Sequence, residues 1–367
     1  MPPRVIMHLD LDSFYAQCEE NANPSLKAKP VVVCVYSGRT AESGAVSTAN
    51  YEARKYGVRA GIPIVRAKKL LESVDAAFVP MNHLYYEQVS ERIMEILRTE
   101  ADAFEQTSID EAFLDVSKRT ALNFDAARNA ALEIKKQVLV QESVTASIGI
   151  GPNKVIAKIA SDQSKPDGLT LVRPEEVTKF LSPLPVGRIP GVGKKAEEKL
   201  SQLSVSTISQ LSNLGPAILV ETFGKSLGAY LYRASRGEDD DPVKEREQPT
   251  QFSRIATLKE NTRRAEDTFP LLTELANSVS AKLVSHGMSC KSVAITAILT
   301  DLSIHNRSKM LESSSADGKV IEATARQLTQ EFLQSKPDAV LRRLGVRASG
   351  LTRETGQTNM SKFLTAQ

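Results

Sequence analysis

The segment Glu238–Pro249 restricts what this chain can fold into more than any other stretch of the sequence. It is dense in charge, contains two prolines and has almost no apolar side chain. Such a segment adds nothing to a hydrophobic core and is typical of a linker. The 367 residues are therefore expected to fold as separate units on its two sides, with about two to four domains in all.

The residues before this linker predict an α+β domain. Residues 4–12 alternate, with apolar side chains on one face and His8, Asp10 and Asp12 on the other, which predicts a strand that ends in acids. Further strands are predicted at 31–35, 103–106, 112–116 and 144–150, and helices at 47–56, 85–99, 124–141 and 153–162. The strands on either side of residues 107–111 read as a hairpin, so the sheet is expected to be mostly antiparallel.

The pattern changes after about residue 171. Short helices, separated by Gly and Pro, are predicted at 180–184, 194–203, 208–214 and 227–236. Beyond the linker, a small α/β sandwich is predicted, with strands at 252–258, 292–300 and 342–348 and helices at 270–286 and 320–334. The polar residues 352–367 are expected to form a flexible tail.

Composition favours a globular protein of the cell interior. The sequence contains no run of about 20 apolar residues that could span a membrane. Cys18, Cys34 and Cys290 lie far apart, which indicates a reduced, cytoplasmic protein without a disulfide framework or zinc site. Residues 251–353 carry 15 Lys and Arg against 10 Asp and Glu. This surplus suits a surface that binds polyanions, although an ordinary solvated face would look the same.

Two pairs of acids suggest a metal site. Asp10 and Asp12 share a face at the end of the first predicted strand, and Asp110 and Glu111 are adjacent in the predicted hairpin. Transfer of a phosphoryl group to a hydroxyl needs charge neutralisation and positioning, which two metal ions about 4 Å apart can supply. Asp10, Asp110 and Glu111 could converge as the ligands. The alternative, that these acids are solvated turn residues, stays open on spacing alone.

The words around these acids resemble the Y family of DNA polymerases, and most closely the archaeal members of the polymerase IV branch. The resemblance covers about residues 1–350. The words that carry it come in the family's order: Asp10–Glu20 (DLDSFYAQCEE), Ser43–Arg54 with Gly57–Pro63, Ser108–Ala112 (SIDEA), Pro152–Ala160 and Ser164–Gly168. A chance match of five such words in order is negligible.

The resemblance implies a multidomain, right-hand-like α+β architecture. Its expected parts are a palm with an antiparallel sheet, small fingers, a helical thumb with a helix–hairpin–helix, and an α/β-sandwich little finger. The boundaries in this chain would be palm 1–14 and 80–170, fingers 15–79, thumb 171–237, linker 238–250, little finger 251–351 and tail 352–367.

The resemblance also implies the catalytic roles. Asp10 and Asp110 would bridge two Mg²⁺ ions, for which Mn²⁺ can substitute, and Glu111 would hold the catalytic one. The backbone carbonyl of Leu11 would complete the shell of the nucleotide's metal. Asp12 is not expected to be a ligand and would position neighbouring backbone or be solvated.

The incoming deoxynucleoside triphosphate (dNTP) would contact a second set of residues. Tyr15 would be the steric gate, whose ring clashes with a ribose 2′-hydroxyl. The triphosphate would be held by Thr48, Tyr51, Arg54 and Lys165, since guanidinium and ammonium groups suit phosphate oxygens. The small Gly44 and Ala45 would leave an open roof over the templating base.

Two further segments are expected to face primer–template DNA. Gly191, Gly193 and Lys194 open a helix and resemble a helix–hairpin–helix, whose turn amides bind a phosphate and can also hold a monovalent cation. A P-loop is poorly supported because its G-x-x-x-x-G-K-[ST] spacing is missing. The second is the basic surface of Arg254, Lys259, Arg342, Arg343 and Arg347. On a strand Arg343 and Arg347 share a face and Arg342 lies opposite, so all three could touch one phosphate strand only through a bulge or at a sheet edge.

The tail contains a word similar to a sliding-clamp box. One helical turn would bring together its apolar residues as a plug for a hydrophobic pocket. The word consists of Gln357, Met360, Phe363 and Leu364, the last of which replaces the usual second aromatic residue.

The sequence thus predicts a template-directed, error-prone translesion DNA polymerase. It would extend a primer 3′-hydroxyl, act as a monomer in the cytoplasm near the nucleoid, and bind no membrane. Every region is assigned, so no proofreading exonuclease is expected, and the short fingers predict low fidelity. Two alternatives remain: a catalytically silent DNA-binding scaffold of the same fold, and another palm-type enzyme such as a nucleotide cyclase.

Overall fold

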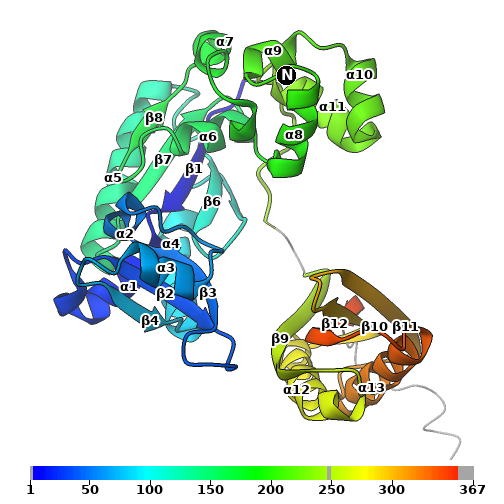
Figure 1. Cartoon of the computed structure of the whole chain (residues 1–367). Coiled ribbons are helices and arrows are strands. Elements are labelled where there is room, and N and C mark those ends of the chain that lie inside the picture. The colour runs from blue at the N-terminus through cyan, green and yellow to red at the C-terminus, as the bar shows by residue number, and fades with distance from the viewer. Residues whose placement is uncertain (1–2, 246–248, 354–367) are drawn as a thin grey trace, which may run out of the picture. The chain divides into compact units, whose positions relative to one another are not determined.

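The computed structural model describes residues 3–245 and 249–353, which form two compact units (Figure 1). Of the described residues, the first contains 3–34, 46–62 and 66–245, and the second contains 35–45, 63–65 and 249–353. Within the described residues, no helix is both long and apolar enough to cross a membrane.

The first unit is built on a five-stranded sheet in the order β5-β6-β1-β7-β8. Its strands are β1 (Ile6–Leu11), β5 (Ala103–Gln106), β6 (Glu111–Asp115), β7 (Ala146–Gly151) and β8 (Leu169–Leu171). The first strand of the chain lies at the centre and pairs antiparallel with β6 and β7; only β7 and β8 are parallel. The predicted hairpin and the mostly antiparallel sheet are confirmed.

Helices cover both faces of this sheet. The apolar face of β1 packs in one core with α4 (His83–Thr99) and α5 (Phe124–Glu142). The opposite face, which carries His8, is covered by α6 (Lys154–Ser161). Gly149 lies opposite His8 in β7, and a Cβ there would stand 2.0 Å from the carbonyl oxygen of Ala157. The missing side chain therefore lets α6 lie directly on the sheet.

A second, three-stranded sheet has the order β3-β2-β4. Its strands are β2 (Val31–Tyr36), β3 (Gly44–Ala49) and β4 (Ala77–Pro80), with the short helices α2 (Tyr51–Lys55) and α3 (Ile64–Leu70) in the same stretch of chain and α1 (Phe14–Ala22) before it. The helix predicted at 47–56 is wrong in its first half. Asn50 ends the strand and caps α2, since its side chain accepts the N–H of Val31 and of Ala53, both at 3.0 Å.

Five short helices follow the first sheet. They are α7 (Val177–Leu181), α8 (Lys194–Gln202), α9 (Ile208–Ser212), α10 (Pro216–Phe223) and α11 (Lys225–Ala234). The sequence analysis missed α10, because Gly215-Pro216 reads as a break. Pro216 stands at the first position of the helix, where a missing N–H costs nothing.

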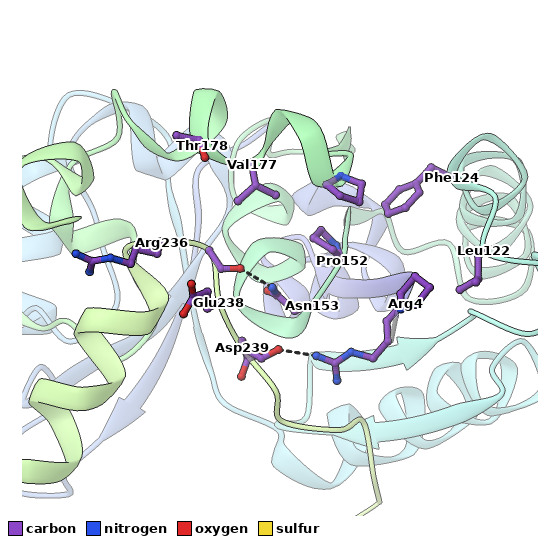
Figure 2. A pocket seen from close by; sticks show the side chains of 13 residues that line it. Arg4, Leu122, Phe124, Pro152, Asn153, Val177, Thr178, Arg236, Glu238 and Asp239 are labelled. Atoms are coloured by element: carbon purple, nitrogen blue, oxygen red, sulfur yellow. Dashed lines mark hydrogen bonds between the residues drawn. The ribbon is translucent and has the colours of Figure 1, made fainter. Parts of the chain in front are cut away.

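The segment after α11 packs against the rest of the first unit. Figure 2 shows Arg4 and Asn153 reaching toward it: Asn153 donates to the carbonyl of Gly237 at 2.7 Å and Arg4 donates to that of Asp239. These residues line a cavity of about 370 Å³. Val243 is buried in a small apolar cluster with Ile6 and other residues of the sheet. The described first part of the predicted linker is therefore attached rather than free.

The second unit is a four-stranded antiparallel sheet in the order β11-β10-β12-β9. It consists of β9 (Gln251–Thr262), β10 (Met288–Leu299), β11 (Ile304–Ser315) and β12 (Leu341–Arg353), and α12 (Phe269–Ser285) and α13 (Gly318–Ser335) pack on one face (Figure 1). The sandwich prediction is confirmed. Strand β11 was not predicted, because nearly all its side chains are exposed and show no apolar alternation.

Candidate active site

The sheet register brings the predicted acids to one end of β1. Asp10 lies directly opposite Glu111 across the antiparallel β1–β6 pair. The N–H of Leu11 donates to the carbonyl of Asp110 at 2.9 Å, which ties the hairpin turn to the end of β1. The Asp110 carboxylate accepts from the Ser108 hydroxyl at 2.5 Å. Asp10 and the adjacent pair Asp110 and Glu111, about 100 residues later, are thus brought to the same end of the β1–β6 pair.

Lysines hold two of these acids. Lys165 Nζ lies 2.7 Å from Asp10 Oδ2 and 2.7 Å from Asp162 Oδ1, and Lys158 Nζ lies 2.7 Å from Glu111 Oε2. In the part of the chain that the structure describes, no three His, Cys, Asp or Glu side chains are already arranged to hold a metal ion. Ammonium groups instead provide the positive charge that these partly buried carboxylates need.

The two opposed carboxyls have pKa values displaced in opposite directions. Burial raises the pKa of Asp10 to about 7, although Lys165 pulls it down. Burial also acts to raise the pKa of Glu111, but its hydrogen bond with Lys158 and the neighbouring charges outweigh burial and lower it to about 2. Two adjacent acids in a desolvated site need cations. Their hard oxygen donors fit Mg²⁺ or Mn²⁺.

His8 and Lys158 are site residues that the sequence analysis did not assign. His8 is fully buried, with Nδ1 2.7 Å from Ser161 Oγ and Nε2 3.3 Å from Lys158 Nζ. Burial, then Lys158, lowers the pKa of His8 to about 3, so the ring is neutral. The alternation that places His8 on the face of Asp10 was the available signal for the first residue. Lys158 carried none in isolation.

Asp12 is a buried structural acid. Its carboxylate accepts from Ser147 Oγ at 2.8 Å, from Thr145 Oγ1 at 3.1 Å and from the N–H of Asp167 at 2.8 Å. It is 2% exposed. These donors occupy both of its oxygens, so Asp12 joins β1 to β7 and to the loop that follows Lys165.

The predicted nucleotide contacts lie close to this end of β1. The Tyr51 hydroxyl donates to Asp12 Oδ1 at 3.4 Å, and the Arg54 guanidinium carbon lies 4.7 Å from the Tyr51 ring centroid. Arg54 Nε also donates to the carbonyl of Ala49 at 2.8 Å, at the end of the strand that carries Thr48. Tyr15 is half-buried in α1, and its ring stacks on Tyr86.

The small residues assigned to a roof have packing reasons of their own. A Cβ on Gly44 would stand 2.2 Å from the carbonyl oxygen of Val35, so glycine is required there. Ala45 forms an isolated antiparallel bridge with Pro63. Gly44 and Ala45, together with their neighbours Val35 and Pro63, belong to the second unit.

The predicted helix–hairpin–helix has the expected local geometry. Gly191 has φ +84°, a conformation that favours glycine, and Gly193 is the N-cap of α8, whose first residue is Lys194. The Tyr230 hydroxyl supports the turn by donating to the carbonyl of Pro190 at 2.8 Å. The amides at the start of α8 therefore stand beside a glycine-rich turn.

The basic residues of the second unit do not all share one face. Arg343 and Arg347 lie opposite Ile298 and Ala294 of β10, on the sheet face away from the helices. Arg254 instead pairs with Val346, whose side chain is buried on the helix side. The register shifts between Leu341 and Arg343, which is the bulge that Arg342 would need. Lys259 is an exposed residue of β9.

The Nε atoms of Arg343 and Arg347 are buried and have no hydrogen-bond partner among the described residues. Both side chains are only half-buried on the open face of the sheet, so each guanidinium group keeps some contact with solvent. The predicted clamp box, Gln357, Met360, Phe363 and Leu364, lies outside the described residues.

Comparison with known proteins agrees with this arrangement. Models of the impB/mucB/samB family match residues 9–162 and, for its C-terminal domain, 249–361, and a DNA polymerase-iota thumb model matches 187–239. The chain is 44% identical to DNA polymerase IV of Nitrosopumilus maritimus over 99% of this chain and all of that one. A Y-family DNA polymerase chimera aligns with TM-score 0.89 and 37% identity, covering 95% of this chain and all of the other. An insertion ternary complex of Dbh DNA polymerase aligns with TM-score 0.68 and 36% identity over the same shares.

The chain belongs to the Y family of translesion DNA polymerases. Within that family it resembles the archaeal polymerase IV proteins, and it is a DNA-directed DNA polymerase. The right-hand-like architecture predicted from the sequence is confirmed. Y-family polymerases use divalent metal ions and dNTPs.

Proposed function

We propose that this chain copies a DNA template by two-metal-ion nucleotidyl transfer to a primer 3′-hydroxyl. The observation that carries the proposal is the pairing of Asp10 with Glu111, with the Asp110 turn hydrogen-bonded to the end of the same strand. Backbone hydrogen bonds on both sides of β1 hold these carboxylates in place before any ligand arrives. Such preorganisation is what a charge-stabilising site requires.

Asp10, Asp110 and Glu111 would hold two Mg²⁺ or Mn²⁺ ions, with the Leu11 carbonyl as a further ligand. The ions would supply the positive charge that activates the primer hydroxyl and stabilises the leaving pyrophosphate. Once these ions neutralise the charge of the Asp10 carboxylate, Asp10 would no longer need the Lys165 ammonium. Lys165 is then free to reach the triphosphate together with Tyr51, Arg54 and Thr48.

The nucleotide's sugar and base would meet the opposite side of the site. Tyr15 would exclude a ribose 2′-hydroxyl by clash. Gly44 and Ala45 would leave space above the templating base, which suits damaged templates. The low fidelity expected for such an open site is not corrected, because no segment is assigned to a proofreading exonuclease.

Primer–template DNA is the proposed macromolecular substrate. A solved structure similar to this chain is an insertion ternary complex of Dbh DNA polymerase, which supports the binding of primer–template DNA here. The amides at Gly191 and Gly193 and the side chain of Lys194 would bind one phosphate, with room for a monovalent cation. Arg254, Lys259, Arg342, Arg343 and Arg347 would follow the backbone, and the C-terminal box would bind a sliding clamp.

The domain limits belong to the same proposal. The palm would be 1–14 and 80–170, the fingers 15–79, the thumb 171–237, the linker 238–250, the little finger 251–351 and the tail 352–367. The chain would work as a monomer in the cytoplasm, near the nucleoid.

Primer extension with Mg²⁺ and four dNTPs tests the proposal. The wild type should extend a labelled primer, and Asp110→Ala should not, while both bind primer–template DNA equally. Asp75→Ala is the matched control, because Asp75 is a surface acid with an 80% exposed side chain and should leave extension unchanged. Extension by Asp110→Ala would overturn the metal assignment. DNA binding without extension by the wild type would support the scaffold alternative.

A further inference from the structure

The ring of Tyr15 has a partner of its own. Tyr15 in α1 and Tyr86 in α4 stack with centroids 4.4 Å apart and an interplanar angle of 16°. Tyr15 is half-buried and leaves part of its ring accessible, whereas Tyr86 is fully buried. One ring therefore faces the site and the other supports it from the core.

Tyr86 is itself held at both ends. Its ring belongs to the core of the first sheet, and its hydroxyl donates to a carboxylate oxygen of Glu19. Glu19 stands one helical turn after Tyr15 on α1, so the two contacts of Tyr86 grip the same helix. Burial together with a hydrogen bond leaves this ring little freedom to shift.

Helix α4 also holds the turn that carries Asp110. Ser90, one turn after Tyr86 on α4, is 2% exposed and donates to the carbonyl of Ile109. The Asp110 carboxylate is close enough to Tyr15 to raise its pKa, after the larger effect of burial. One face of α4 therefore sets the positions of both the gate ring and the catalytic turn.

We propose that Tyr86 is the positioning residue of the sugar gate and thereby a determinant of sugar specificity. This inference rests on the proposed role of Tyr15. Exclusion by clash works only if the excluding ring cannot retreat, because a ring that yields by a fraction of an ångström admits the extra oxygen. Tyr86 prevents the Tyr15 ring from moving away from the sugar. Ser90 holds the turn that carries Asp110, so the space between this turn and the Tyr15 ring stays constant.

The test is the ratio of kcat/KM for a dNTP to that for the matching ribonucleotide in single-nucleotide insertion. Tyr86→Leu removes the supporting ring, and the ratio is expected to fall by about tenfold, in the range typical for a pocket contact. Insertion of dNTP should change less. Tyr86→Phe keeps the ring and should retain most of the discrimination. Glu19→Ala frees the hydroxyl while leaving both rings, and should lower the ratio by a smaller factor.

Leu97→Ala is the matched control for loosened packing. Leu97 is fully buried on the same helix, about 16 Å along its axis from Tyr86 by helical rise, and its loss should leave the ratio unchanged. If Leu97→Ala lowers the ratio as much as Tyr86→Leu does, general destabilisation is the cause and the inference fails.

Tyr15→Ala separates the inference from the proposal beneath it. If Tyr15→Ala abolishes discrimination while Tyr86→Leu and Glu19→Ala leave it intact, Tyr15 is the gate and Tyr86 does not position it. If Tyr15→Ala itself leaves discrimination unchanged, the gate assignment is overturned first, and the role of Tyr86 falls with it. Because Glu19→Ala alters no core side chain, the test holds even if Tyr86→Leu fails to fold.

Discussion

The two larger sheets of this protein use similar strands in opposite ways. In the first unit β1 is buried on both faces, and the acids at its end are matched by partners inside the protein, Asp10 by a lysine and Asp12, just beyond the strand, by hydroxyls. In the second unit helices pack on only one face, and the other carries the half-buried side chains of Arg343 and Arg347. A site that directs bond formation needs charges fixed beforehand, whereas a surface that follows a polyanion needs accessible donors.

The largest expected effect is on the buried sheet. Glu111→Ala removes one of two opposed carboxylates, and kcat for primer extension should fall by about 10³-fold or more, as for other preorganised electrostatic groups. Affinity for primer–template DNA should stay within about twofold. Single-turnover extension and fluorescence anisotropy measure the two quantities. Strongly weakened DNA binding would mean that the two sheets do not divide the work in this way.

Asp12→Ala should mainly lower stability. Four donors, from Ser147, Thr145, Tyr51 and the Asp167 backbone, would lose their acceptor inside the protein. The free energy of unfolding should fall by about 3 kcal/mol, since each unsatisfied buried group costs about 1–3 kcal/mol and water can satisfy part of the loss. The urea-induced unfolding transition of the first unit measures this change in the free energy of unfolding. The exposed Asp75→Ala should change it by less than about 0.5 kcal/mol.

The open sheet should respond in binding instead. Replacing Arg343 and Arg347 together by Ala should weaken DNA binding by about tenfold or more, and the slope of log K against log salt should become shallower by about 2. The rate constant for nucleotide insertion at saturating DNA should be unchanged. A salt slope equal to that of the wild type would show that these two guanidinium groups do not neutralise phosphates.

The smallest effect is expected for Met310→Ser on the open face of β11. Met310 lies opposite Ser292 and is 64% exposed, so little apolar burial is lost. The free energy of unfolding should change by less than about 0.5 kcal/mol. Ile148→Ala in β7, fully enclosed in the first sheet, should cost about 2–5 kcal/mol by the same measurement.

The sequence predicted most of the elements that hold the site, because local patterns define them. The alternation around Asp10, the hairpin that carries Glu111 and the helix start at Asn153 can all be read within a few residues. The partners Lys158 and His8 could not be assigned in the same way. Their contacts join residues about 50 to 150 positions apart and depend on how α6 lies on the sheet.

What the sequence analysis missed has equally specific causes. The end of β3, residues 47–49, was taken for the start of a helix because the capping role of Asn50 depends on its bond to Val31 in a neighbouring strand. The sheet face on which Arg254 lies could not be predicted, because the face that an edge-strand residue occupies depends on the pairing register. The packing of the first part of the linker was not predicted, because Val243, which is buried in the first unit, is a single apolar residue in a charged segment.

The central place of β1 has a consequence for biosynthesis. The strand that carries Asp10 precedes both of its neighbours in the chain, because β6 and β7 end at residues 115 and 151. More than 130 residues after β1 must therefore be synthesised before the strand can be paired on both sides. Such non-local pairing is slow to form and leaves an apolar edge exposed in the meantime. Until then, the segment that carries Asp10 is exposed to non-native pairing and aggregation.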